Sequence, residues 1–254
     1  MEIARRSNDT GSEMVFGIRA IIESIRAGKE IDKLYVQKNL TNELITELLV
    51  ISHEYHVPVL KVPVEKLNRI TRKNHQGAVA YISAIQYASL DHVISSAYGK
   101  GESPLVLILD RITDVRNFGA IARTAECAGV HGIVVPSKGG AAINSDAMKT
   151  SAGALNFIPV CREHNLKNTI TFLKENGLHI VACTEKSEEP LYTGKLSEPC
   201  AIIVGSEEDG ISQEYLKLAD EKVMIPMVGN IQSLNVSVSA GIIIYEAIRQ
   251  RSGG

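Results

Sequence analysis

The sequence predicts an α/β protein with two parts, a small N-terminal α/β domain and a larger domain built on a mostly parallel sheet. Short apolar segments typical of strands alternate with segments whose apolar residues recur at helical spacing, first over residues 15–82 and again from residue 104. Between these stretches the chain lacks a strong hydrophobic period and ends in GKGESP, which indicates a linker. The predicted boundaries are a domain over 1–84, a linker over 85–103 and a domain over 104–254.

Composition and charge are those of an ordinary globular protein. The chain has 254 residues, of which 44% are hydrophobic and 22% charged, so it can bury a core. A net charge of -2 gives no global attraction to nucleic acid or membrane, and a polyanion site would therefore be a local patch. The four cysteines show no paired spacing, and the polar start MEIARRSNDTGSEM lacks the apolar core of a signal peptide. We expect a cytoplasmic protein without a metal site, with residues 1–13 as a disordered lead.

Alternating helices and strands are expected in the N-terminal domain. Isoleucines at helical spacing indicate the first helix, and Gly28 is suited to end it. A later helix can begin at Pro63, because proline is tolerated in a first helical turn. The expected elements are a helix over 15–28, a strand over 34–36, a helix after Thr41, a strand over 57–60, a helix over 63–70 and a strand over 77–82.

Five strands, mostly parallel and with helices on both faces, are expected in the second domain. Leu105–Leu109 is a continuous apolar run, as expected of a strand that is buried on both sides. The expected strands are 105–109, 132–135, 179–183, 201–204 and 223–225. The expected helices begin at about residue 118, lie within 143–154, span 166–175 and 212–219, and follow Ser233 or Asn235.

The segment Val223–Arg251 combines a short strand, a loop without charged side chains and a capped helix. Pro226 and several polar residues interrupt its apolar residues, so its longest continuous apolar run is too short to cross a membrane. Such a loop offers backbone N–H groups and few charges, which suits a neutral or zwitterionic ligand. An ordinary core helix that follows a long loop is the alternative. The apolar walls of this loop would be Ile225, Met227 and Leu234, which suit a flat aromatic ring.

Two further loops follow strands at the edge where ligands bind in open α/β sheets. In the first, Asn117 would point into the crevice and, together with Asp114, cap a helix, while Arg123 would clamp a phosphate or activate a hydroxyl. A surface pair between Arg123 and Glu126 is the alternative. In the second, GSEEDGIS, Gly205 allows close backbone approach and Glu207 would orient an amine or hydroxyl. A solvated acidic loop is the alternative.

Several motifs are missing from the sequence. No G-x-G-x-x-G follows a strand, no G-x-S-x-G elbow occurs, and no histidine lies in the three loops. These absences argue against a dehydrogenase or a hydrolase and favour an enzyme that transfers a group without a metal. A separate basic cluster, Arg69, Arg72 and Lys73, is either a phosphate-facing patch for RNA or a solvated face.

Three ordered stretches resemble the motifs of the SpoU/TrmH family of RNA ribose 2'-O-methyltransferases. They are NFGAIARTAECAG, IIVGSEEDGIS and IPMVGNIQSLNVSVSAGIIIYEAIRQ. The stretches VFGIRAIIESI and HQGAVAYI resemble the small substrate-binding domain of that family. Within the family, the chain is most similar to the bacterial enzymes that methylate a guanosine ribose in large-subunit (23S) ribosomal RNA.

The resemblance implies a SPOUT-type trefoil knot, a homodimer and S-adenosylmethionine as cofactor. It assigns the reaction to Arg123, Asn117, Glu207, Ser233 and Asn235, and cofactor binding to Thr184, Gly205, Ile225, Met227 and Leu234. Because the chain has no tryptophan, base stacking would rely on Phe118, tyrosines or arginine planes. Methylation of transfer RNA, methylation of a ribosomal adenosine that confers antibiotic resistance, and a noncatalytic RNA-binding role are the alternatives.

Overall fold

The computed structural model describes residues 14–231 and 233–253, so the expectation for residues 1–13 lies outside the described part of the chain. The chain divides into two compact units. The first contains the residues up to Ile85 together with Ala142–Asp146, and the second contains Gln86–Ala141 and Ala147–Gly254.

The first unit is a four-stranded sheet with helices on both faces. Its strand order is β1-β4-β2-β3, with β2 and β3 parallel and the other pairs antiparallel. Side chains of α1 and α2 form the main core with one face of the sheet, and α3 packs on the other face. The elements are β1 (Met14–Phe16), α1 (Ile18–Arg26), β2 (Ile31–Gln37), α2 (Glu43–Glu54), β3 (Val59–Val62), α3 (Val64–Ile70) and β4 (Ala78–Ile82).

The sequence did not predict β1, because a strand of three residues is too short to show a period. It pairs with β4, and two of its residues, Val15 and Phe16, were assigned to the first helix by the sequence. Gly17, with φ of +90°, makes the turn between β1 and α1.

The second unit is a six-stranded sheet in which every pair is parallel, in the order β10-β8-β9-β5-β6-β7. The predicted parallel sheet is therefore confirmed, but the predicted number of five strands is wrong. The missed strand is β7, whose charged residues Arg162 and Glu163 obscured its apolar start. The strands are β5 (Leu105–Asp110), β6 (Gly132–Pro136), β7 (Val160–Glu163), β8 (His179–Cys183), β9 (Cys200–Gly205) and β10 (Glu221–Val223).

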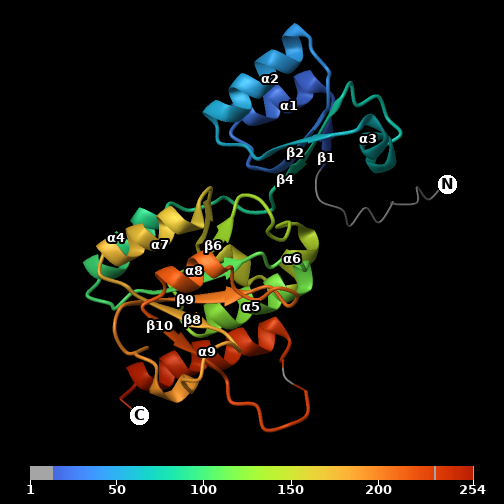
Figure 1. Ribbon diagram of the computed structural model, residues 1–254. Coiled ribbons are helices and arrows are strands. Elements are labelled where there is room, and N and C mark those ends of the chain that lie inside the picture. The colour runs from blue at the N-terminus through green and yellow to red at the C-terminus, as the bar shows by residue number, and fades with distance from the viewer. Residues whose placement is uncertain (1–13, 232, 254) are drawn as a thin grey trace, which may run out of the picture. The chain divides into compact units, whose positions relative to one another are not determined.

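Helices cover both faces of this sheet, as Figure 1 shows. Val106 and Ile108 of β5 join the core formed by one set of helices, whereas Leu105, Leu107 and Leu109 alternate to the other face. The first face carries α4 (Leu90–Gly99), α7 (Leu166–Glu175) and α8 (Gln213–Leu218). The opposite side carries α5 (Val115–Cys127), which packs against α9 (Val236–Arg251), while α6 (Ser145–Thr150) lies against α5.

Helix α4 corrects the prediction of a linker over residues 85–103. Ser89 caps this helix by accepting a hydrogen bond from the backbone of His92. Leu90, Val93 and Ile94 are buried in the core of the second unit, so the segment is an integral part of that fold. No helix in the described ranges is long and apolar enough to cross a membrane.

Close contact between helices α5 and α6 depends on Gly119. A Cβ atom at Gly119 would lie 2.7 Å from the Cβ of Thr150 and 3.1 Å from the Ala147 carbonyl oxygen, so α5 and α6 approach too closely for a side chain. At Gly241 of α9, a Cβ atom would lie 3.7 Å from Thr124, an ordinary van der Waals contact. Packing therefore does not require glycine at position 241.

Candidate active site

A cavity of about 440 Å³ opens at the carboxyl ends of β8 and β9 and is closed by the loop between β10 and α9. Its volume is in the range of small-molecule sites. The five residues predicted to bind a cofactor all line it: Thr184, Gly205, Ile225, Met227 and Leu234. Of the predicted catalytic residues, Glu207 and Ser233 also line it. Its remaining walls come from Cys183, Glu185, Lys186, Val204, Ser206, Glu208, Asp209, Gly210, Val236 and Ser239.

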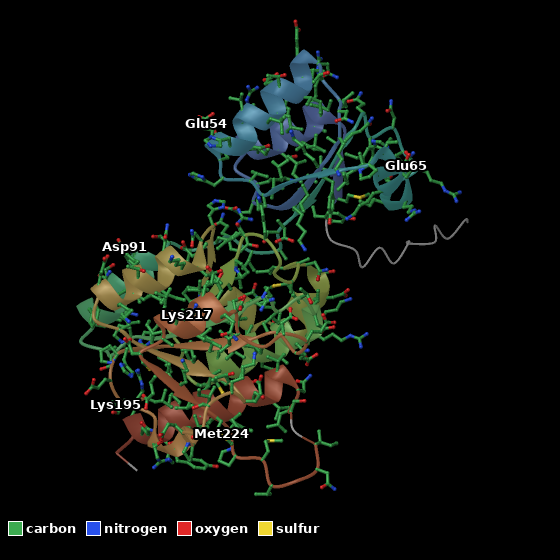
Figure 2. All side chains as sticks on the ribbon, viewed as in Figure 1. Glu54, Glu65, Asp91, Lys195, Lys217 and Met224 are labelled. Atoms are coloured by element: carbon green, nitrogen blue, oxygen red, sulfur yellow. The ribbon has the colours of Figure 1, made fainter. Side chains whose placement is uncertain are left out.

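Backbone hydrogen bonds fix the start of the closing loop at Met224, which is labelled in Figure 2. The Met224 amide donates to the Glu189 carbonyl at 2.8 Å, and the Met224 carbonyl accepts from the Leu191 amide at 2.7 Å. The predicted strand 223–225 thus ends earlier, at Val223, since Met224 pairs with the neighbouring loop and not with β8. This leaves Ile225 and Met227 to form an apolar wall.

The loop after β9 folds back on Gly205 so tightly that no side chain fits there. The Gly210 amide donates to the Ser206 carbonyl at 2.9 Å, which closes the loop. A Cβ atom at Gly205 would lie 2.1 Å from the carbonyl carbon of Gly210 and 2.2 Å from the amide nitrogen of Ile211. Only glycine is compatible with this turn, which brings backbone groups to the edge of the cavity.

One carboxylate joins the three predicted loops. Glu207 Oε1 accepts hydrogen bonds from Asn117 Nδ2 at 3.0 Å and from Asn235 Nδ2 at 2.8 Å. The Val236 amide lies 3.3 Å from the same oxygen. Asn235 Nδ2 also donates to Asn117 Oδ1 at 3.0 Å, so the three side chains form a closed network. Three segments that are far apart in the sequence thus meet beside the cavity.

The sequence assigned Asp114 and Asn117 together to one helix cap, but the two side chains have different partners in the structure. Helix α5 begins at Val115 and not near Phe118, and Asp114 is its N-cap, accepting from the amides of Arg116 and Asn117 at 2.8 and 2.9 Å. The predicted capping role of Asn117 is therefore wrong, and its side chain is free to reach Glu207. At α9, Asn235 rather than Ser233 is the N-cap. Phe118 is 1% exposed, so the expectation that it stacks on a base is also wrong.

Arg123 lies on α5, exposed and apart from the network. In the described part of the chain, its guanidinium has no hydrogen-bond or ion-pair partner, and the alternative pair with Glu126 does not form. A cationic group with five donors is thus available for a ligand.

A second network, which was not predicted from the sequence, holds the loop after β9. Asp110, 2% exposed, accepts hydrogen bonds from the amide and the hydroxyl of Ser212, both at 2.7 Å. Arg111 donates to Asp209 at 2.8 Å and to the Gly210 carbonyl at 3.1 Å. The hydrogen bond to Asp110 raises the pKa of Arg111, which keeps this clamp charged. A charged residue at the end of an apolar strand was the signal that the sequence offered.

The thiol of Cys183 lies on the cavity wall, in surroundings that disfavour its ionisation. Burial raises the pKa of Cys183 to about 12, with a further contribution from the Glu185 carboxylate. An unfolded thiol ionises near pH 8.5, so the unfolded state loses this proton first, and the free energy of unfolding falls as pH rises above that value. We expect iodoacetamide at pH 8 to label the exposed Cys127 before Cys183, as measured by peptide mass spectrometry. Equal labelling rates would contradict the burial of Cys183.

The predicted RNA-binding residues lie in the first unit. Arg69 is in the last turn of α3, and Arg72 and Lys73 follow it, all three exposed. Lys73 Nζ lies 5.2 Å from the centre of the Phe16 ring, within cation–π distance. The patch thus combines positive charge with an aromatic ring. Whether it faces a phosphate stays a prediction.

Family profiles match both parts of the chain. The profile of the SpoU rRNA Methylase family matches residues 104–245. The profile described as RNA 2'-O ribose methyltransferase substrate binding matches residues 14–88.

Individual proteins support the same grouping. A Bacillus subtilis (strain 168) protein assigned to the TrmH family of tRNA/rRNA methyltransferases is 33% identical over 94% of this chain and 96% of its own. The SpoU methyltransferase AviRb from Streptomyces viridochromogenes, solved with the cofactor AdoMet, has the same fold with a TM-score of 0.61 and 24% identity, covering 98% of this chain and 96% of that chain. The A. aeolicus TrmH/SpoU tRNA modifying enzyme is 31% identical with a TM-score of 0.55, covering 63% of this chain and 85% of that chain.

Proposed function

The chain belongs to the SpoU rRNA Methylase family and is an RNA methyltransferase, and we propose that it methylates the ribose 2'-hydroxyl of a guanosine in 23S ribosomal RNA with S-adenosylmethionine. The observation that carries the proposal is the Glu207 network, which joins the three predicted loops beside one cavity. The resemblance of the sequence to enzymes of that specificity supports the choice of RNA and nucleotide.

The cavity fits the proposed cofactor. Its apolar wall of Ile225, Met227 and Leu234 suits the adenine ring, and the tight turn at Gly205 lets backbone groups approach it. Thr184 and Glu185, at the end of β8, offer a hydroxyl and a carboxylate for the polar parts. When bound, the cofactor supplies a methyl group on a positively charged sulfur, and transfer forms an oxygen–carbon bond while the carbon–sulfur bond breaks.

The residues around this cavity position the ribose and withdraw its proton. Asn117, Glu207 and Asn235 form a rigid polar surface that orients the hydroxyl, since each side chain is held by the other two. Arginine stays protonated in proteins, so Arg123 would not accept the hydroxyl proton itself. It would hold a substrate phosphate that takes this proton, and its charge would stabilise the oxygen as the proton leaves. Ser233, exposed at the cavity, would bind the substrate or the amino acid part of the cofactor.

We propose that residues 1–84 select the RNA and that residues 104–254 bind the cofactor in a knotted domain. Arg69, Arg72 and Lys73 would contact phosphates. Deletion of the first domain should abolish selection of RNA while cofactor affinity is kept, and a loss of cofactor affinity would contradict this division.

We also propose that the enzyme is a homodimer. Helix α9 and the loop before it expose large apolar side chains, including Val238 at 48% and Tyr245 at 53% of their surface, which an interface would cover. Light scattering of the purified protein tests this.

The experiment that tests the proposed function is a methyl-transfer assay with labelled S-adenosylmethionine. Ribosomal RNA and transfer RNA from cells that lack the protein serve as separate substrates, and mass spectrometry identifies the methylated nucleoside. Label in 2'-O-methylguanosine of 23S ribosomal RNA is expected. Transfer RNA is the second candidate, favoured by the similarity to the A. aeolicus enzyme named for tRNA modification. Label in neither RNA would refute the proposal.

A further inference from the structure

A second cavity lies on the other side of the loop after β9. It has a volume of about 290 Å³ and shares the wall Ser206–Asp209 and the residue Val236 with the first cavity. Its other walls are Arg111, Ile112, Thr113, Asp114, Asn117 and Gly139. The two cavities therefore meet at Glu207, the carboxylate that binds Asn117 and Asn235. A group held in the second cavity would adjoin the position to which the methyl group is transferred.

Its volume is at the lower end for small-molecule sites, which suits a single base better than a longer segment of RNA. Enzymes that do chemistry on a base take it out of the stack and hold it in such a pocket, and a ribose drawn to the Glu207 network would bring its own base to the adjoining cavity. With the ribose at the Glu207 network, a base in the second cavity would lie beside Asn117 and the loop Ser206–Asp209.

The carboxylates of this cavity differ in what they already bind. Asp209 is paired with Arg111 at 2.8 Å, and Asp114 caps α5. Glu207 is held by the two asparagines. Glu208 is exposed, and no residue in the ranges 14–231 and 233–253 binds its carboxylate. One negative group in the second cavity is therefore free for a ligand, and it disfavours a phosphate there.

We infer that the second cavity holds the base of the target nucleotide and that Glu208 reads it as guanine. A carboxylate accepts two hydrogen bonds and donates none. Guanine presents two adjacent donors, N1–H and the 2-amino group, on its Watson–Crick edge, whereas adenine places an acceptor beside its amino group. Glu208 thus favours guanine over adenine and repels the ring nitrogen of adenine. The inference rests on the proposed function and adds the residue that selects the nucleotide.

The test compares nucleotides that differ by one donor. After the methylated position has been mapped, RNA oligonucleotides of that sequence are made with guanosine, inosine or adenosine at this position. Inosine keeps N1–H and lacks the 2-amino group. For the wild-type enzyme we expect kcat/KM for guanosine to exceed that for inosine by about 10-fold or more, because one hydrogen bond to a charged group is lost.

The variant Glu208→Gln should lower kcat/KM for guanosine by about 10- to 100-fold and reduce the preference over inosine to a few-fold, since an amide offers one acceptor in place of two. Its affinity for S-adenosylmethionine, measured by calorimetry, should stay unchanged. The matched control is Glu185→Gln, which changes a carboxylate of the first cavity alone and should leave the guanosine-to-inosine ratio as in wild type.

Each other outcome is informative. An unchanged ratio in Glu208→Gln, with methylation intact, would overturn the inference and leave the proposed function standing. Glu208 lies on the wall that both cavities share, so weaker cofactor binding in that variant would show that its carboxylate acts on the cofactor side, and it would also overturn the inference. Methylation of no RNA by the wild-type enzyme would refute the proposed function itself.

Discussion

Replacement of Arg123 by alanine is expected to lower the rate of methyl transfer by about 10²- to 10³-fold, the range for loss of one group that stabilises developing negative charge. The guanidinium is exposed on α5 and has no partner in the described part of the chain, so its removal should leave the fold unchanged. Because Arg123 lies outside the cavity at Gly205, the affinity for S-adenosylmethionine should stay the same. Single-turnover rates with saturating cofactor, together with calorimetry, measure the two quantities.

Arg116 provides the matched control, since it is an exposed arginine on the same helix. We expect Arg116→Ala to change the rate by a few-fold at most. Arg123→Lys keeps the charge but not the two-pronged geometry, so partial activity in this variant would indicate that charge matters more than bidentate contact with a phosphate. Full activity of Arg123→Ala would show that the reaction does not depend on this residue.

Replacement of Gly205 by alanine should abolish or strongly weaken cofactor binding. The added Cβ atom would lie 2.1 Å from the Gly210 carbonyl carbon, and backbone atoms cannot yield as a flexible side chain can. The loop Ser206–Gly210 must then move, which opens one wall of the cavity. We expect the dissociation constant for S-adenosylmethionine to rise by at least 10-fold, and the free energy of unfolding to fall by about 1–3 kcal/mol, as overpacking commonly costs.

The same substitution at Gly99 is the control for Gly205→Ala. Gly99 is the last residue of α4, and no atom lies within 4 Å of the position that its Cβ would occupy. Alanine there should leave cofactor affinity unchanged and should not lower the melting temperature. If Gly205→Ala bound the cofactor as tightly as wild type, the turn after β9 would not be part of the binding site.

The sequence predicted most helices and strands of the second unit because their periodic signals are long. Helix α7 and strand β8 have the predicted bounds, since α7 shows a clear helical period over ten residues and β8 is a largely apolar run of five. The errors have two causes. β1 and β7 are short strands defined by their partners, and a local pattern does not record such pairing. Helix α4 does carry a helical pattern, since its buried residues are Leu90, Val93, Ile94 and Ala97, but the loop-like GKGESP that follows it favoured a linker.

The candidate site likewise contains residues that the sequence predicted and residues that it did not. Gly205, Glu207 and Asn235 were recognisable because each belongs to a motif whose loop follows a strand. Asp110, Arg111 and Ser212 were missed, since their importance lies in contacts over about a hundred positions of sequence. Likewise, only the structure distinguished Glu208 from its neighbours, because it showed that Glu207 and Asp209 already have hydrogen-bond or ion-pair partners.

By itself, the sequence determined the α/β class, the parallel sheet of the second unit and the three loops that carry the site, because hydrophobic period and loop chemistry are local properties of the chain. Only the tertiary structure decided that Asn117 binds Glu207 instead of capping α5, that Phe118 is buried, and that two cavities meet at one carboxylate. These outcomes depend on which groups compete for the same hydrogen bonds and the same space once distant segments are brought together.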